Sequence, residues 1–85
     1  MARVLDVKGL YCPEPVLRTE RVMRDLPAGE ALTVLATDPA SVIDFTYYCH
    51  CAGLELLSVI KEPGLFTFEI RKPATYGLRR ENDSA

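Results

Sequence analysis

Long apolar runs are absent from this chain of 85 residues, which also has no tryptophan and a single histidine. No stretch approaches the roughly 20 apolar residues that a membrane-spanning helix needs, so no membrane segment is expected. The first ten residues lack the apolar core of a secretory signal, which favours a cytoplasmic protein. A net charge of −2 excludes the broad basic surface of a dedicated nucleic-acid binder, so direct nucleic-acid contact is not expected either.

The chain is long enough for one domain only, because two separate cores would each be too small to be stable. Its composition, 48% hydrophobic and 26% charged, is that of a globular protein. We expect the folded domain to span residues 1–73. Residues 74–85 are mostly polar and are predicted to form a flexible tail.

Hydrophobic periodicity predicts an α/β fold. Apolar residues three or four apart indicate helices, alternating or β-branched residues indicate strands, and prolines and glycines mark the boundaries. The expected order is strand 4–7, helix 13–26, strand 31–37, helix 39–52, strand 54–61 and strand 66–71. Because strand–helix–strand units cross over with one hand, both helices should cover one face of a four-stranded mixed sheet. The sequence therefore predicts a two-layer sandwich of order βαβαββ.

The second face of this sheet has no predicted layer to cover it. Leu35 and one side of the third strand, either Leu57 with Val59 or Leu56 with Ile60, are therefore expected to be exposed. Such residues form either a contact for a partner or a second copy, or ordinary scattered surface aliphatics.

Three cysteines without a secretion signal argue against a disulfide framework, so at least one thiol should be free. Cys49 shares the apolar face of the second helix with Phe45 and is expected to be a buried, small hydrophobic residue. Cys51 should point to solvent and is interpreted as incidental. No metal site is expected, because a C-x-C spacing on a helix directs the two sulfur atoms apart.

Cys12 lies where the first strand passes into the first helix, and Pro13, Glu14 and Pro15 follow it. We expect Cys12 to be the N-cap residue, with the Glu14 backbone N–H reaching its sulfur. This donor and the positive end of the helix dipole should both lower the pKa of the thiol. The prolines should hold the sulfur at a rigid, exposed corner. The pattern thus predicts an accessible, activated thiol, the alternative being a cysteine that only fills a turn.

The stretch LDVKGLYCPEPV at residues 5–16 resembles the signature of the TusA/SirA-like sulfur-carrier family, as do residues 29–44 and 66–72. The resemblance implies that Cys12 receives sulfane sulfur as a persulfide, with Pro13, Glu14 and Pro15 in supporting positions. It implies a cysteine desulfurase or rhodanese-type donor, and a DsrE-like protein or a tRNA-thiolation component as acceptor. It also implies a sulfurtransferase with no cofactor beyond the transient persulfide, serving tRNA thiolation, molybdenum-cofactor metabolism or sulfur oxidation.

Arg18 and Arg21 lie on the polar face of the first helix and could dock an acidic region of the donor or acceptor. An ordinary solvated helix face is the alternative interpretation. Two other functions stay open at this point. One is a non-catalytic RNA- or protein-binding regulatory module in which Cys12 is structural, and the other is a redox switch that pairs Cys12 with Cys51.

Overall fold

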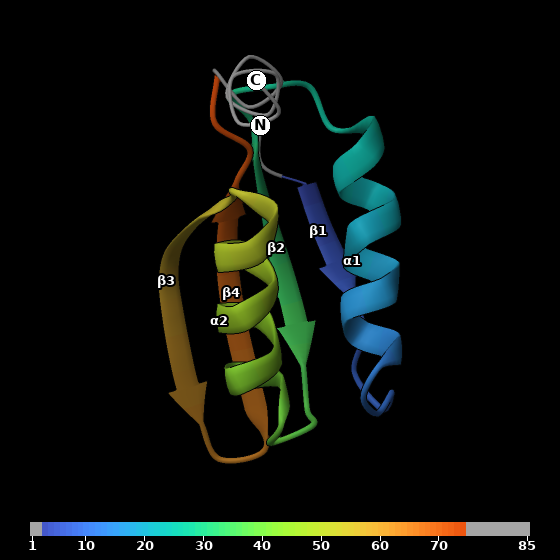
Figure 1. The fold of residues 1–85 in the computed structure, drawn as a ribbon. Helices are drawn as coiled ribbons and strands as arrows, with labels where there is room; N and C mark the ends of the chain where they lie inside the picture. The colour runs from blue at the N-terminus through green and yellow to red at the C-terminus, as the bar shows by residue number, and fades with distance from the viewer. Residues whose placement is uncertain (1–2, 75–85) are drawn as a thin grey trace.

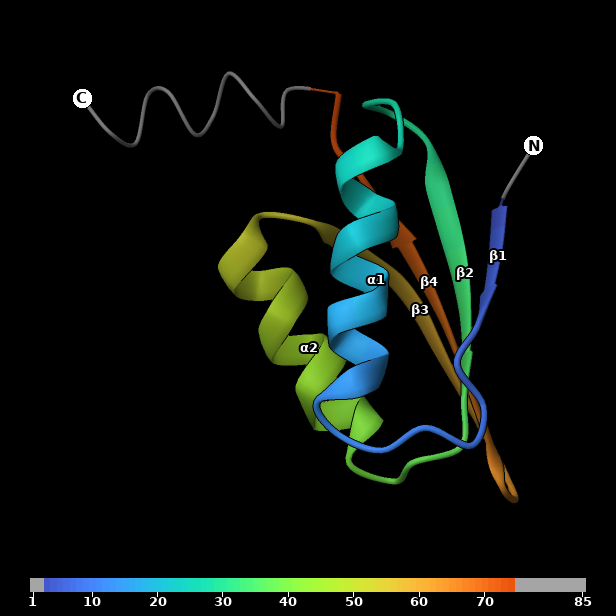
Figure 2. The same cartoon turned by 90° about the vertical axis from the view of Figure 1, so that its right-hand side faces the viewer.

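The computed structural model describes residues 3–74, which form one sheet with two helices on a single face (Figure 1). The elements are β1 (Arg3–Asp6), α1 (Glu14–Asp25), β2 (Ala31–Ala36), α2 (Ser41–Ala52), β3 (Glu55–Glu62) and β4 (Leu65–Arg71). Figure 2 shows the sheet nearly edge-on, with both helices on the same side. The predicted two-layer α/β sandwich of order βαβαββ is confirmed. The predicted tail lies outside the described residues from residue 75 onward, so the tail and the domain boundary stay predictions.

The strands are arranged in the order β1-β2-β4-β3. β1 and β2 are parallel, and β4 is antiparallel to both of its neighbours. Because β1 and β2 are parallel, their carboxyl ends lie at the same end of the sheet, and both helices begin there (Figure 1). In open α/β sheets, functional loops gather at the carboxyl ends of the strands. The segments that lead into α1 and α2 therefore form the natural place for a site.

The core lies between the helices and the sheet, as the periodicity predicts. Met23 of α1 and Phe45 of α2 are buried, and so is Phe68 of β4. The ring centroids of Phe45 and Phe68 are 4.6 Å apart, so an aromatic pair joins the helical layer to the sheet. Within residues 3–74, neither helix is long and apolar enough to cross a membrane.

β3 exposes a different pair of residues from either pair that simple alternation predicts. Its pairing with β4 shifts between Leu56 and Ser58, so that Leu57 is an extra residue in the ladder. Leu56 and Val59 pack against the core, whereas Leu57 and Ile60, each 51% exposed, do not. Both predicted pairs are therefore wrong, because the extra residue moves every following side chain to the opposite face.

Both helices begin later than predicted. α1 begins at Glu14, and its N-cap residue is Pro13 rather than Cys12, with no side-chain cap. α2 begins at Ser41 rather than Pro39. Polar side chains ahead of α2 instead accept hydrogen bonds from the backbone of the segment that leads into α1.

Candidate active site

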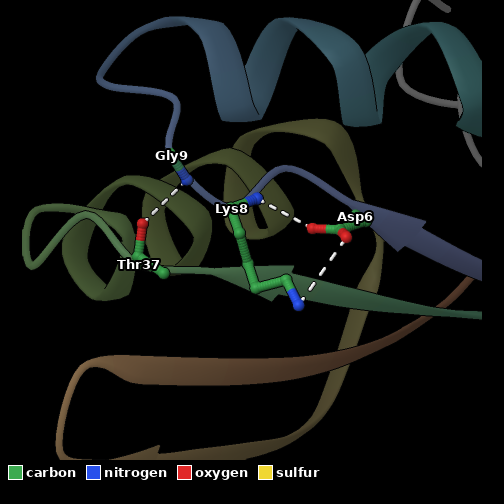
Figure 3. A network of polar contacts seen from close by, with 4 residues as sticks. All are labelled: Asp6, Lys8, Gly9 and Thr37. Carbon is green, nitrogen blue, oxygen red and sulfur yellow. Dashed lines mark hydrogen bonds and ion pairs between the residues drawn. The ribbon is translucent and has the colours of Figure 1, made fainter.

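Hydrogen bonds hold the start of the segment that joins β1 to α1, residues 7–13, in place. The Gly9 N–H donates to Thr37 Oγ1 at 2.9 Å, and the Lys8 N–H donates to Asp6 Oδ1 at 3.0 Å (Figure 3). Thr37 directly follows β2, so the first of these bonds links the two neighbouring segments. Gly9 has a φ of +84°, a left-handed conformation that glycine adopts without strain. These contacts fix the path of the chain ahead of the thiol.

The carboxylate of Asp38 holds the same segment in place through a hydrogen bond at Cys12 itself. Oδ2 of Asp38 accepts the Cys12 N–H at 2.9 Å, and Oδ1 accepts the Ala40 N–H at 3.1 Å. Asp38 is only 9% exposed, and a buried carboxylate needs such donors to offset its lost hydration. The N-cap residue of α2 is Ala40, and the Asp38 side chain joins the segments that lead into α1 and α2. The position of Cys12 is therefore set by the entry to α2 as well as by α1.

The thiol of Cys12 is exposed and in hydrogen-bonding contact with the carboxylate of Asp44, in the first turn of α2. This hydrogen bond, followed by desolvation and by the negative charges of Asp44 and Asp38, raises the pKa of the Cys12 thiol. The prediction of a lowered pKa is wrong. The Glu14 N–H donates to the Tyr11 carbonyl at 2.9 Å rather than to the sulfur.

The three residues after Cys12 shape the beginning of α1. The peptide bond between Cys12 and Pro13 is cis, and Pro15 is buried. Glu14 is exposed, and its Oε1 lies 3.6 Å from Nε of Arg18, one turn along the helix. The Glu14 carboxylate is therefore paired with a cation on the surface of its own helix.

An apolar depression of about 330 Å³ lies between α1 and α2, and Cys12 is on its wall. Cys51, interpreted from the sequence as an incidental surface thiol, lines the same depression. The Tyr47 hydroxyl hydrogen-bonds with the Cys51 thiol, which raises the pKa of Tyr47. The lining residues are Cys12, Pro13, Val16, Asp44, Tyr47, Tyr48 and Cys51. The two exposed thiols of the chain thus share one surface feature.

Cys49 is 2% exposed, and burial raises the pKa of its thiol to about 11, which confirms the prediction of a buried hydrophobic residue. All three cysteines are free. His50, the single histidine, lines a different depression on α2 and does not accompany Cys12. Within residues 3–74, no group of three or more histidine, cysteine, aspartate or glutamate side chains is arranged to hold a metal ion.

The two arginines predicted to dock a partner, Arg18 and Arg21, are both exposed on α1. Arg18 is paired with Glu14, as described above. Arg21 forms no ion pair with any residue between positions 3 and 74. Arg21 is therefore the more available of the two cations for a partner.

Comparison with known proteins finds relatives that match most of this chain. The family described as "Sulfurtransferase TusA" matches residues 3–72. A sulfur carrier protein TusA from Pseudomonas savastanoi pv. phaseolicola is 46% identical over 69 residues, covering 81% of this chain and 82% of that protein. The corresponding protein of Pseudomonas putida (strain GB-1) is 45% identical over 71 residues, covering 84% of this chain and 89% of that protein.

A similar solved structure is the crystal structure of a SirA-like protein from Desulfitobacterium hafniense. Its TM-score is 0.74 at 25% sequence identity, covering 86% of this chain and 99% of that chain. The family match extends over almost all of the described residues, and two sulfur carriers are about 45% identical. The resemblance seen in the sequence is confirmed: this chain belongs to the TusA family of sulfur carrier proteins.

Proposed function

We propose that the protein accepts one sulfane sulfur atom on Cys12, holds it as a persulfide and passes it to an acceptor protein. The family supports a role as sulfur carrier. The observation that carries the assignment to this residue is the position of Cys12, an exposed thiol on a segment fixed by the buried Asp38. A carrier needs such a thiol, because the sulfur must reach the active sites of two different proteins.

Loading moves one sulfur atom between two cysteines. The thiolate of Cys12 attacks the terminal sulfur of a donor persulfide, R–S–SH, and a new S–S bond forms. The S–S bond of the donor breaks, and the donor cysteine leaves as a thiolate that takes up the proton Cys12 has released. The products are Cys12–S–SH and R–SH, so no external oxidant or reductant is consumed. Delivery repeats the step, with an acceptor thiolate attacking the terminal sulfur on Cys12.

The donor we infer is a cysteine desulfurase or a rhodanese-type protein. The acceptor we infer is a DsrE-like protein or a tRNA-thiolation component, in tRNA thiolation, molybdenum-cofactor metabolism or sulfur oxidation. In each case the protein acts in the cytoplasm as a relay that turns over only with its partners and needs no cofactor beyond the persulfide. These assignments come from the family resemblance rather than from any contact in the structure.

Intact mass spectrometry after incubation with a cysteine desulfurase, its cofactor and cysteine tests the proposal. The wild-type chain should gain one sulfur atom that a reductant removes. Cys12→Ser should lose this gain completely, whereas Cys49→Ser and Cys51→Ser should keep it. The two controls also replace a sulfur atom by oxygen, at the buried Cys49 and at the exposed Cys51.

Two results would contradict the proposal. A gain that requires Cys51 as well as Cys12 would favour a thiol switch, for which the shared depression is the supporting observation. Absence of any gain with several unrelated donors, together with slow alkylation of Cys12, would favour a binding module in which Cys12 is structural.

A further inference from the structure

Asp44 is a half-buried carboxylate that lines the same depression as Cys12 and contacts its thiol. Its place in the first turn of α2 stabilises its negative charge through the helix dipole. Within the part of the chain that the structure describes, no lysine or arginine forms an ion pair with Asp44. The nucleophile therefore lies beside a carboxylate that pairs with no cation among residues 3–74.

A carboxylate in this position acts against thiolate formation. It accepts a hydrogen bond from the protonated thiol and repels the thiolate, whereas sulfur transfer requires the thiolate. The titratable groups that face the thiol from the neighbouring segments are Asp38, Asp44, Tyr47, Tyr48 and Cys51. None of these groups is a cation, and Arg18 of α1 is engaged by Glu14.

We propose that Asp44 keeps the unloaded Cys12 thiol protonated and slow to react, and that a cationic side chain of the sulfur donor releases the thiolate by pairing with Asp44. This inference rests on the sulfur-carrier function proposed above. A donor cation would compete for the carboxylate oxygens and place a positive charge close to the sulfur, and both effects favour the thiolate. The proton that Cys12 gives up then passes to the departing donor thiolate. The free carrier is thereby protected from oxidants and electrophiles, which attack thiolates.

The first test measures the rate of Cys12 alkylation by iodoacetamide as a function of pH. The measurement uses the full chain with Cys51→Ser, so that Cys12 is the one exposed thiol. Asp44→Asn should move the midpoint of the profile to lower pH, and Asp44→Glu should keep it high. If the midpoint falls by one pH unit, alkylation below it should become about threefold to fourfold faster, because more thiolate forms but each thiolate is less nucleophilic. The matched control, Asp25→Asn at the exposed end of α1, should leave the midpoint unchanged.

The second test measures sulfur loading of the same variants by a cysteine desulfurase. If the donor neutralises Asp44, Asp44→Asn should gain in alkylation rate but not in loading rate. An unchanged alkylation midpoint would overturn the restraint by Asp44, and equal gains in both rates would overturn release by the donor. If Cys12 accepts no sulfur from any donor while the midpoint still moves, the sulfur-carrier function fails but the restraint by Asp44 stands.

Discussion

Asp38 and Asp44 act on different atoms of Cys12. Asp38 accepts the backbone N–H of Cys12 and so positions the residue, whereas Asp44 contacts the thiol and so acts on its protonation. The sequence identifies Cys12 readily, because its flanking prolines form a local pattern. It does not identify either contact, since the two partners lie 26 residues apart in one case and on another helix in the other. The position and protonation of Cys12 are therefore set by residues that are distant in sequence but close in the folded chain.

The buried Cys49 should make the stability of the fold depend on alkaline pH. Burial raises the pKa of its thiol from 9.0 to about 11. Between these values the unfolded chain releases the thiol proton while the folded chain retains it, so folding stability falls as pH rises. The contribution is complete below about pH 9 and should fall by about 2–3 kcal/mol by pH 11. Urea denaturation at stepped pH values measures this loss.

Tyrosine and lysine side chains also titrate in this range, so the comparison with Cys49→Ala isolates the thiol. The variant should lose less stability than the wild-type chain between pH 9 and pH 11, whatever its stability at neutral pH. Parallel curves for the two proteins would show that Cys49 does not titrate as its burial requires.

Lys72 connects the end of β4 to the end of α1. Its Nζ donates to the carbonyl of Met23 at 2.8 Å and to the carbonyl of Leu26 at 2.9 Å. Carbonyl groups at a helix C-terminus lack intrahelical partners, and a cation there also interacts favourably with the helix dipole. A single side chain thus holds the end of one layer against the other.

Lys72→Met should lower the free energy of unfolding by about 1–3 kcal/mol, because it leaves these carbonyl groups without a charged donor. Lys61→Met is the matched control: it makes the same change at an exposed position on β3 and should alter stability by no more than about 0.5 kcal/mol. Urea denaturation monitored by circular dichroism measures both. A Lys72→Met variant as stable as the control would mean that water satisfies the helix end equally well.

Among the elements, the parts of the fold that depend on local chain chemistry are predicted well. Gly53 ends α2 with a φ of +76°, as a glycine at that place indicates. The apolar face that Phe45 and Cys49 share on α2 is also correct. The bulge at Leu57 is not predictable, because it depends on how β3 pairs with β4 and leaves no local mark in the sequence. The start of α2 at Ser41 is not predicted either, and the Asp38 carboxylate ahead of it divides its hydrogen bonds between Cys12 and Ala40.

The whole molecule presents two unlike surfaces. The helical layer carries the thiol, the apolar depression and the exposed cations of α1. Neither α1 nor α2 covers the other face of the sheet (Figure 2). Leu57 and Ile60, at 51% exposed, and Val4, at 62%, are among its exposed apolar residues. A protein that exchanges sulfur at Cys12 must meet the helical layer.

Docking to this layer should depend on Arg21. Arg21→Glu should slow loading by a desulfurase about threefold to tenfold at low salt, since exposed charges at an interface mainly change association rates. The effect should diminish as salt is added, because exposed charges are screened. Arg18→Glu should act in the same direction, with an added like-charge contact to Glu14.

The control for Arg21 is Arg3→Glu, which makes the same change of charge on an exposed residue at the opposite end of β1 from the thiol segment. Loading of this variant should match the wild-type chain. Alkylation of Cys12 by uncharged iodoacetamide should be equal in all three variants, because the substitutions are aimed at encounter with the donor rather than at the thiol. Equal slowing of loading by Arg3→Glu and Arg21→Glu would show that net charge, rather than a docking surface on α1, governs encounter. If neither Arg18→Glu nor Arg21→Glu slows loading, the polar face of α1 is an ordinary solvated surface. Recognition would then be confined to the depression beside Cys12.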